Sequence, residues 1–93
     1  MAIDWNKYGF VQASKYRTKI VDSLASSPKT PSQITKETGL FKSHISTVLK
    51  ELVTEGIIIC LTPDLRRGKI YGLTSIGMMV VEKSIQKHSS KHE

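Results

Sequence analysis

The stretch TPSQITKETGLFKSHISTVLKELVTEGII, residues 30–58, contains two helix patterns joined by a short turn. Thr30 is a favourable N-cap, and Pro31 suits the first helical position. Gln33, three residues after the cap, completes a capping box. Gly39 favours the left-handed conformation that commonly ends a helix. The sequence therefore predicts a short helix that stops at Gly39 and a second helix directly after the turn.

The second helix of this pair, residues 41–55, is apolar on one side only. Its apolar residues recur at spacings i, i+3, i+4 and i+7, which is the pattern of a helix with one buried face. When that stripe is buried, the polar residues of the first turns must face outward. The stripe consists of Ile45, Val48, Leu49 and Leu52, and the outward residues are Lys42, Ser43, His44, Ser46, Thr47 and Lys50.

The flanking segments complete the pattern. Residues 14–26 predict an earlier helix, which must end near Pro28 because the residue before a proline avoids the helical conformation. After Gly56, a β-branched run, a loop rich in turn residues and the alternating segment 69–73 predict a β-hairpin with a charged tip. A last helix follows Thr74, which is a natural cap.

The element order is helix, helix, helix, strand, charged loop, strand, helix. We therefore expect a mainly α fold with a small β-hairpin (α+β). The short glycine-containing turn between the second and third helices indicates a helix-turn-helix, and the hairpin makes it a winged helix. Gly9 argues against a long helix at the N-terminus. The expected division is an N-terminal arm, extended or in a short turn (1–13), a winged-helix DNA-binding domain (14–88) and a disordered tail (89–93).

The charge balance points to a polyanionic partner. The 93 residues include 14 Lys and Arg against 8 Asp and Glu, which gives a net charge of +6 and a pI near 9.6. An excess of this size in a small domain favours nucleic acid, and the alternative is a basic surface without a partner. The single cysteine, Cys60, excludes an internal disulfide and is expected to be a buried, inert thiol.

Other function classes find little support. No segment approaches the roughly 18–20 apolar residues of a membrane span, and the first ten residues lack a signal-type apolar region, so a cytoplasmic protein is expected. The sequence has no phosphate-binding glycine loop, no HExxH or paired-cysteine motif and no framed catalytic triad. We therefore expect no enzyme and no cofactor. His88 and His92 could share a helix face, but no third ligand is evident, so no metal is predicted.

The pattern resembles the winged helix-turn-helix regulators of the MarR/ArsR-like superfamily, and the small archaeal members most of all. The resemblance covers roughly residues 14–82 and implies a transcription regulator that binds duplex DNA as a homodimer. Phe41 departs from the family at a position that usually holds a capping Ser, Thr or Asp. The residues that carry the resemblance are Pro31-Ser32-Gln33-Ile34, Gly39-Leu40, Ser43-His44-Ile45-Ser46, Leu49-Lys50-Glu51-Leu52, Gly56-Ile57, Arg66-Arg67-Gly68-Lys69, Tyr71-Gly72-Leu73-Thr74 and Gly77.

The DNA-binding surface is expected to combine three segments. The third helix would enter the major groove, where the N-terminal residues of a recognition helix meet base edges. The N-terminus of the second helix would lie against the sugar-phosphate backbone, and a basic wing tip would reach the adjacent minor groove or its phosphates. The candidates are Thr30, Ser32, Gln33, Lys42, Ser43, His44, Ser46, Thr47, Lys50, Arg66, Arg67 and Lys69. The alternatives are a solvated face, simple helix capping and a solubilising loop.

The last helix has a broader apolar stripe than one small core requires. Part of it is expected to form a dimer interface, joined by aromatic residues of the N-terminal arm. The alternative is that the arm covers the stripe within one chain. The candidate interface residues are Trp5, Tyr8, Phe10, Met78, Met79, Val81 and Ile85.

Two other functions remain open for this fold. A winged helix can serve as a protein-interaction module inside a transcription or replication assembly, since the fold supports both roles. A ligand or metal sensor is the third option, and the sequence leaves any small-molecule effector unknown. The basic character of both the third helix and the wing favours DNA.

Overall fold

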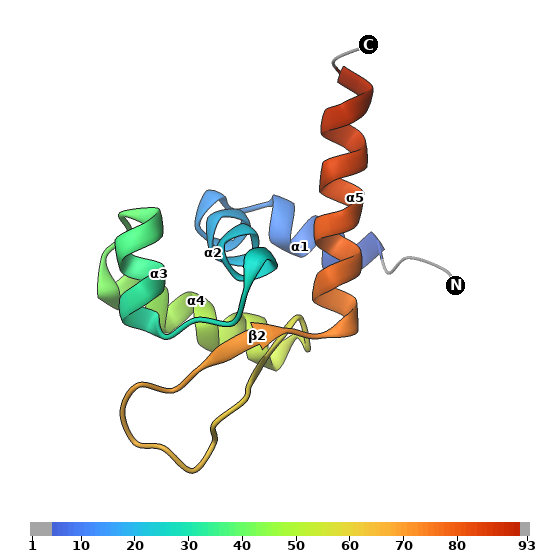
Figure 1. The fold of residues 1–93 in the computed structure, drawn as a ribbon. Coiled ribbons are helices and arrows are strands. Elements are labelled where there is room, and N and C mark those ends of the chain that lie inside the picture. Colours follow the sequence, from blue (N-terminus) through green and yellow to red (C-terminus); the bar gives the residue numbers. More distant parts are fainter. Residues whose placement is uncertain (1–4, 92–93) are drawn as a thin grey trace.

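The computed structural model describes residues 5–91, with side chains described as far as Ser84. Four helices precede a two-stranded hairpin, and a long fifth helix follows it (Figure 1). The predicted winged helix-turn-helix order is confirmed, with one additional helix at the N-terminus. The elements are α1 (Trp5–Gln12), α2 (Lys15–Ser26), α3 (Pro31–Thr38), α4 (Lys42–Thr54), β1 (Ile58–Cys60), β2 (Tyr71–Leu73) and α5 (Ser75–Lys91).

Helix α1 corrects the expectation of an extended arm. Residues 5–12 are helical, and Gly9 lies inside the helix with open space around the position of its missing Cβ. The packing of α1 against α2 and α5 buries Val11 and offsets the low helix propensity of the glycine. Residues 1–4 of the predicted arm lie outside the described residues.

The helix-turn-helix has the predicted boundaries and end chemistry. Thr30 and Gln33 form both bonds of the capping box, and Gly39 ends α3 in the left-handed region at φ 75°. The stripe of α4 is buried, with Ile45 and Leu52 fully inaccessible to solvent. These residues join one core cluster in which α2 is central, because α2 contacts every other helix and β2.

The hairpin is short and is anchored to the segment before α3. Strands β1 and β2 pair antiparallel, with Ile59 opposite Gly72, over only three residues each. Lys29 adds an isolated antiparallel bridge to Tyr71, in which each backbone N–H donates to the other residue's carbonyl at 2.9 and 2.8 Å. The root of the wing and the start of α3 are thus joined through the backbone.

Helix α5 continues to Lys91, beyond residue 88, at which the domain was expected to end. Residues 89–91 therefore belong to the helix and not to a disordered tail. Two serines lower helix propensity only slightly, and no proline or glycine follows Gly77 to stop the helix. Residues 92–93, which include His92, lie outside the described residues. Of the helices described, none combines the length and apolar character needed to cross a membrane.

Candidate nucleic-acid interface

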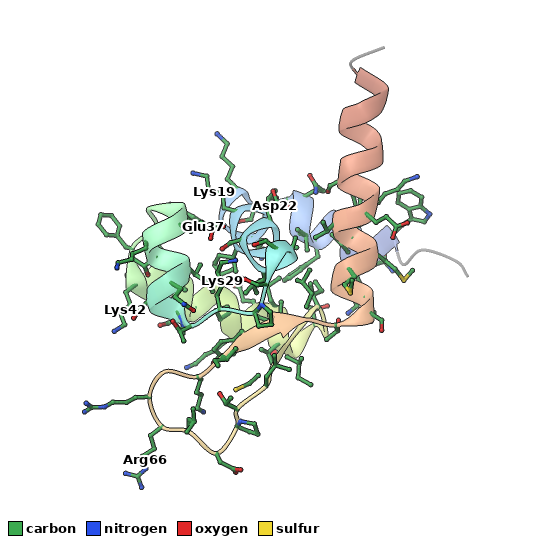
Figure 2. All side chains as sticks on the ribbon, in the orientation of Figure 1. Lys19, Asp22, Lys29, Glu37, Lys42 and Arg66 are labelled. Carbon is green, nitrogen blue, oxygen red and sulfur yellow. The ribbon has the colours of Figure 1, made fainter. Side chains whose placement is uncertain are left out.

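The N-terminus of α3, the start of α4 and the wing surround one basic groove. Its volume is about 570 Å³. Figure 2 shows Lys42 and Arg66 on the side of the molecule where the wing extends, while Lys19 points away from it. The fold therefore brings together cations from two segments that are more than twenty residues apart in the sequence. The groove is lined by Thr30, Pro31, Ser32, Lys42, Arg66, Arg67, Gly68, Lys69 and Tyr71.

The outward face of α4 agrees with the expectation from its apolar stripe. A helix turns by about 100° per residue, so Ser43, Thr47 and Lys50 lie opposite the buried stripe. The Thr47 hydroxyl donates to the Ser43 carbonyl at 3.2 Å, which holds this side chain close to the helix. Short side chains at these positions allow the helix backbone to approach a partner closely. All six predicted outward residues are exposed: Lys42, Ser43, His44, Ser46, Thr47 and Lys50.

His44 occupies the opposite flank of α4 from Lys42. Two residues along a helix correspond to a rotation of about 200°, so Lys42 faces the wing while His44 faces α2. The His44 ring lies 4.9 Å from the ring of Tyr16 and 6.0 Å from that of Phe41, measured between centroids. The structure thus does not bring His44 into the groove beside the wing. The row of rings was not expected from the sequence, because Tyr16 fits the periodicity of a core residue.

The wing tip carries its cations on an exposed loop. Arg66 and Arg67 are exposed, and Gly68 adopts φ 66°, a left-handed conformation that glycine accepts without strain. At the wing root, burial and the neighbouring Cys60 raise the pKa of Tyr71 above its ordinary value of 10.0. Tyr71 therefore stays neutral at physiological pH and adds no negative charge to the groove. Cys60 itself is half-buried, whereas a fully buried thiol was predicted.

Glu51 of α4 and Glu55, the residue that caps its C-terminus, are paired with cations from the neighbouring helices. Arg17 of α2 approaches Glu51 at 3.4 Å, and Lys7 of α1 approaches Glu55 at 2.7 Å. Arg17 also stacks on the Phe10 ring at 3.8 Å and donates to the Phe10 carbonyl. These pairs are partly exposed, so each contributes little to stability. In each pair the cation offsets the negative charge of a carboxylate that lies near the exposed face of α4.

Lys29 fixes the segment that leads into α3. Its side chain is almost buried, and its ammonium donates to the Ser23 carbonyl and, at 2.9 Å, to the Ser26 hydroxyl. The same ammonium lies 3.5 Å from a carboxylate oxygen of Glu37 near the end of α3 (Figure 2). Lysine at a helix C-terminus satisfies carbonyls that the helix itself leaves without partners. Lys29 thus ties the end of α2 to α3.

We expect Lys29→Met to lower the free energy of unfolding by about 2 kcal/mol, because charge-assisted hydrogen bonds to α2 carbonyls are lost while the apolar stem remains. Urea unfolding followed by circular dichroism measures this difference. Lys19→Met is the matched control, because it makes the same chemical change at an exposed position of α2. Equal stability of the two variants would contradict a capping role for Lys29.

The predicted dimer residues divide into two groups. Trp5 and Met78 are strongly exposed, with relative accessibilities of 58% and 63%. Tyr8, Phe10 and Val81 are partly buried against the chain's own core, and Met79 is half-buried. Helix α1 packs on α5, so the arm covers part of the stripe within one chain, as the alternative reading expected. The side chain of Ile85 lies outside the described residues.

The part of the chain that the structure describes contains no group of three or more His, Cys, Asp or Glu residues placed to hold a metal ion. The side chain of His88 and all of His92 lie outside that part.

Three residues that support the candidate interface were not predicted from the sequence: Tyr16, Arg17 and Lys29. Only Lys29, directly between Pro28 and the cap of α3, had a local signal that could have indicated its role.

Comparison with known proteins gives one family match. The model of the bacterial regulatory proteins of the arsR family matches residues 14–59. No curated protein matches the chain by sequence. A solved homodimeric winged helix-turn-helix DNA-binding domain from Mycobacterium bovis, a possible ArsR-family transcriptional regulator, is similar with a TM-score of 0.72 and 19% identity. That comparison covers 95% of this chain and 80% of the other.

Two further structures are similar over most of the chain. A MarR family regulator from Neisseria meningitidis has a TM-score of 0.71 and 25% identity, covering 94% of this chain and 66% of its own. MepR of S. aureus, in a complex with DNA, has a TM-score of 0.77 and 20% identity, covering 95% of this chain and 74% of its own. All three structures come from bacteria, so they give no support to the expected archaeal kinship. The family match over residues 14–59 and the similar solved structures show that the chain has the winged helix-turn-helix fold of ArsR and MarR family regulators.

Proposed function

We propose that this regulator binds duplex DNA with α4 in the major groove and the wing on the adjacent minor groove or its phosphates. The observation that carries the proposal is the basic groove, where Lys42, Arg66 and Arg67 meet the N-terminus of α3. Cations that line such a groove neutralise backbone phosphates, and contacts to the DNA backbone hold a recognition helix in register. The exposed hydroxyls of α4 then lie toward the base edges.

The individual contacts follow from position. Ser43, Thr47 and Lys50 would meet the floor of the major groove, and Ser46 its edge. Thr30, Ser32 and Gln33 would lie beside the phosphate backbone, since the first amides of a helix favour an anion. Lys69 would support the arginines of the wing tip. His44, on the flank toward α2, would contact the opposite strand.

We further propose that the chain acts as a homodimer in the cytoplasm. The exposed Trp5 and Met78 lie on α1 and α5, which pack together, and Lys83 of α5 lies 5.0 Å from the centre of the Trp5 ring. These exposed side chains would form the edge that a second copy covers. A small domain gains stability when a second copy covers such an edge. The similar domain from Mycobacterium bovis is homodimeric, which supports the same arrangement here. In a dimer of this kind the two α4 helices would lie about 34 Å apart, one turn of DNA.

Selection of bound duplexes from a random pool tests this proposal. We expect the recovered sequences to share an inverted repeat whose half-sites are about one helical turn apart, because a two-fold dimer reads the same sequence twice. The affinity for a recovered duplex, followed by fluorescence anisotropy, should fall steeply as salt rises, since phosphate contacts release counterions.

The selection and the titration together separate the alternatives. A pool that stays random while binding persists would show sequence-independent DNA coating. A recovered single half-site would show that the chain binds as a monomer. Absence of duplex binding at about 50 mM salt, where phosphate contacts are strongest, would overturn the proposal and favour a protein-interaction module.

A further inference from the structure

Phe41 is the most exposed large apolar side chain in the part of the molecule whose side chains are described. Its relative accessibility is 75%, although the preceding Leu40 packs against the core. Phe41 is the N-cap residue of α4, yet its side chain makes no capping hydrogen bond. The ring therefore serves neither the core nor the helix end, and it stands in water at the start of the proposed recognition helix.

The ring of Phe41 lies against the ring of His44, which in turn lies against Tyr16 of α2. His44 lies edge-on to Phe41 at 6.0 Å with an interplanar angle of 67°, and Tyr16 of α2 lies 4.9 Å from His44. These separations are in the range of about 4.5–7 Å at which aromatic pairs attract one another. A side chain that is already held loses less conformational entropy when it binds a partner. The contact with His44 thus restrains the exposed Phe41 ring on one side.

Phe41 would lie beside the major groove of DNA when α4 occupies that groove. A helix with its side chains is about 10–12 Å across, and the major groove is about 12 Å wide. Both flanks of the helix therefore face the groove walls, the Lys42 flank toward the wing and the His44 flank toward the other strand. The amino end of a recognition helix is the part that meets base edges. Phe41 lies at that end, on the His44 flank.

The chemistry of the groove restricts what Phe41 can recognise. The major-groove edges of the four base pairs present hydrogen-bond donors and acceptors and one apolar group, the C5-methyl of thymine. A phenyl ring buries that methyl favourably, whereas it would desolvate the polar edges without replacing their hydrogen bonds. We infer that Phe41 is a specificity-determining residue that selects thymine at one position of each half-site through contact with the C5-methyl group. This inference rests on the proposed DNA-binding function.

The test removes the methyl group alone. In a duplex recovered from the random pool, each thymine is replaced in turn by deoxyuridine, which keeps the base pair and lacks only the methyl. We expect the affinity of the unmodified protein to fall about fourfold per half-site at one thymine position, the worth of one buried methyl group. The Phe41→Ala variant should bind the thymine and deoxyuridine duplexes equally at that position.

Three controls accompany the test. Phe41→Leu keeps an apolar side chain and should retain part of the sensitivity to the methyl group. Val53→Ala truncates an exposed apolar residue at the other end of α4 and should keep the full sensitivity. The thermal midpoint of Phe41→Ala should equal that of the unmodified protein, because the ring is mostly in water.

The outcomes distinguish this inference from the proposed function. If the duplex binds but no thymine position responds to deoxyuridine, or if the response persists in Phe41→Ala, the inference is wrong while DNA binding stands. If no duplex binds under any condition, the proposed function fails and the inference fails with it.

Discussion

A variant in which Lys42, Lys50, Arg66 and Arg67 are all replaced by alanine is expected to bind its duplex at least about a hundredfold more weakly at low salt. Each phosphate contact contributes a slope of roughly 0.9 to the dependence of log affinity on log salt concentration. A homodimer that loses eight contacts would therefore lose up to about 7 from that slope. Fluorescence anisotropy titrations at several salt concentrations measure both quantities.

A matched pair of single variants controls for the change in net charge. Lys42→Ala and Lys19→Ala each remove one positive charge, but only Lys42 lines the basic groove, while Lys19 extends away from the wing (Figure 2). We expect the salt slope to decrease for Lys42→Ala and to stay unchanged for Lys19→Ala. Unchanged affinity in the quadruple variant, or equal slopes for the two single variants, would show that DNA is bound by another surface.

Gly77→Ala is expected to destabilise the fold by about 3 kcal/mol, the upper range for forcing an extra group into a packed site. A Cβ on Gly77 would lie 2.3 Å from the carbonyl oxygen of Ile57. That oxygen cannot simply move aside, because it accepts hydrogen bonds from both the backbone N–H and the hydroxyl of Thr74 at 3.0 Å. The alanine would have to push α5 away from the start of β1.

Thermal unfolding at fixed protein concentration measures this effect, and a loss of about 3 kcal/mol corresponds to roughly 12–24 °C in a domain of this size. Gly9→Ala is the matched control, since Gly9 is also helical and has no atom within 4 Å of the added group. It should raise stability by roughly 0.5–1 kcal/mol through better helix propensity. A Gly77→Ala protein as stable as the unmodified chain would show that α5 and β1 do not approach as closely as described.

The helix-turn-helix could be predicted from the sequence because its signals are local. The cap at Thr30, the stop at Gly39 and the apolar stripe of α4 act within a few residues, and the structure confirms each of them. Helix α1 could not be predicted in this way. Its helix-weakening Gly9 is outweighed by packing against the neighbouring α2 and against α5, which lies at the other end of the sequence.

The candidate site shows the same division between local and distant information. The exposure of Lys42 and of the hydroxyls on α4 follows from periodicity, and the structure agrees. The position of His44 depends on Tyr16, which comes from another helix and would be taken for a core residue by its spacing. The role of each residue in binding DNA stays a prediction until the titrations are made.

The backbone bridge between Lys29 and Tyr71 gives the hairpin a third, very short partner strand at its root. Because the same peptide segment begins α3, the spacing between the N-terminus of α3 and the base of the wing is set by main-chain hydrogen bonds and not by flexible side chains. The tip of the wing, by contrast, is an exposed loop. We therefore expect the protein to tolerate variation in groove depth at the tip of the wing. It should reject duplexes that are over- or underwound between the contact made by α3 and the contact made by the wing.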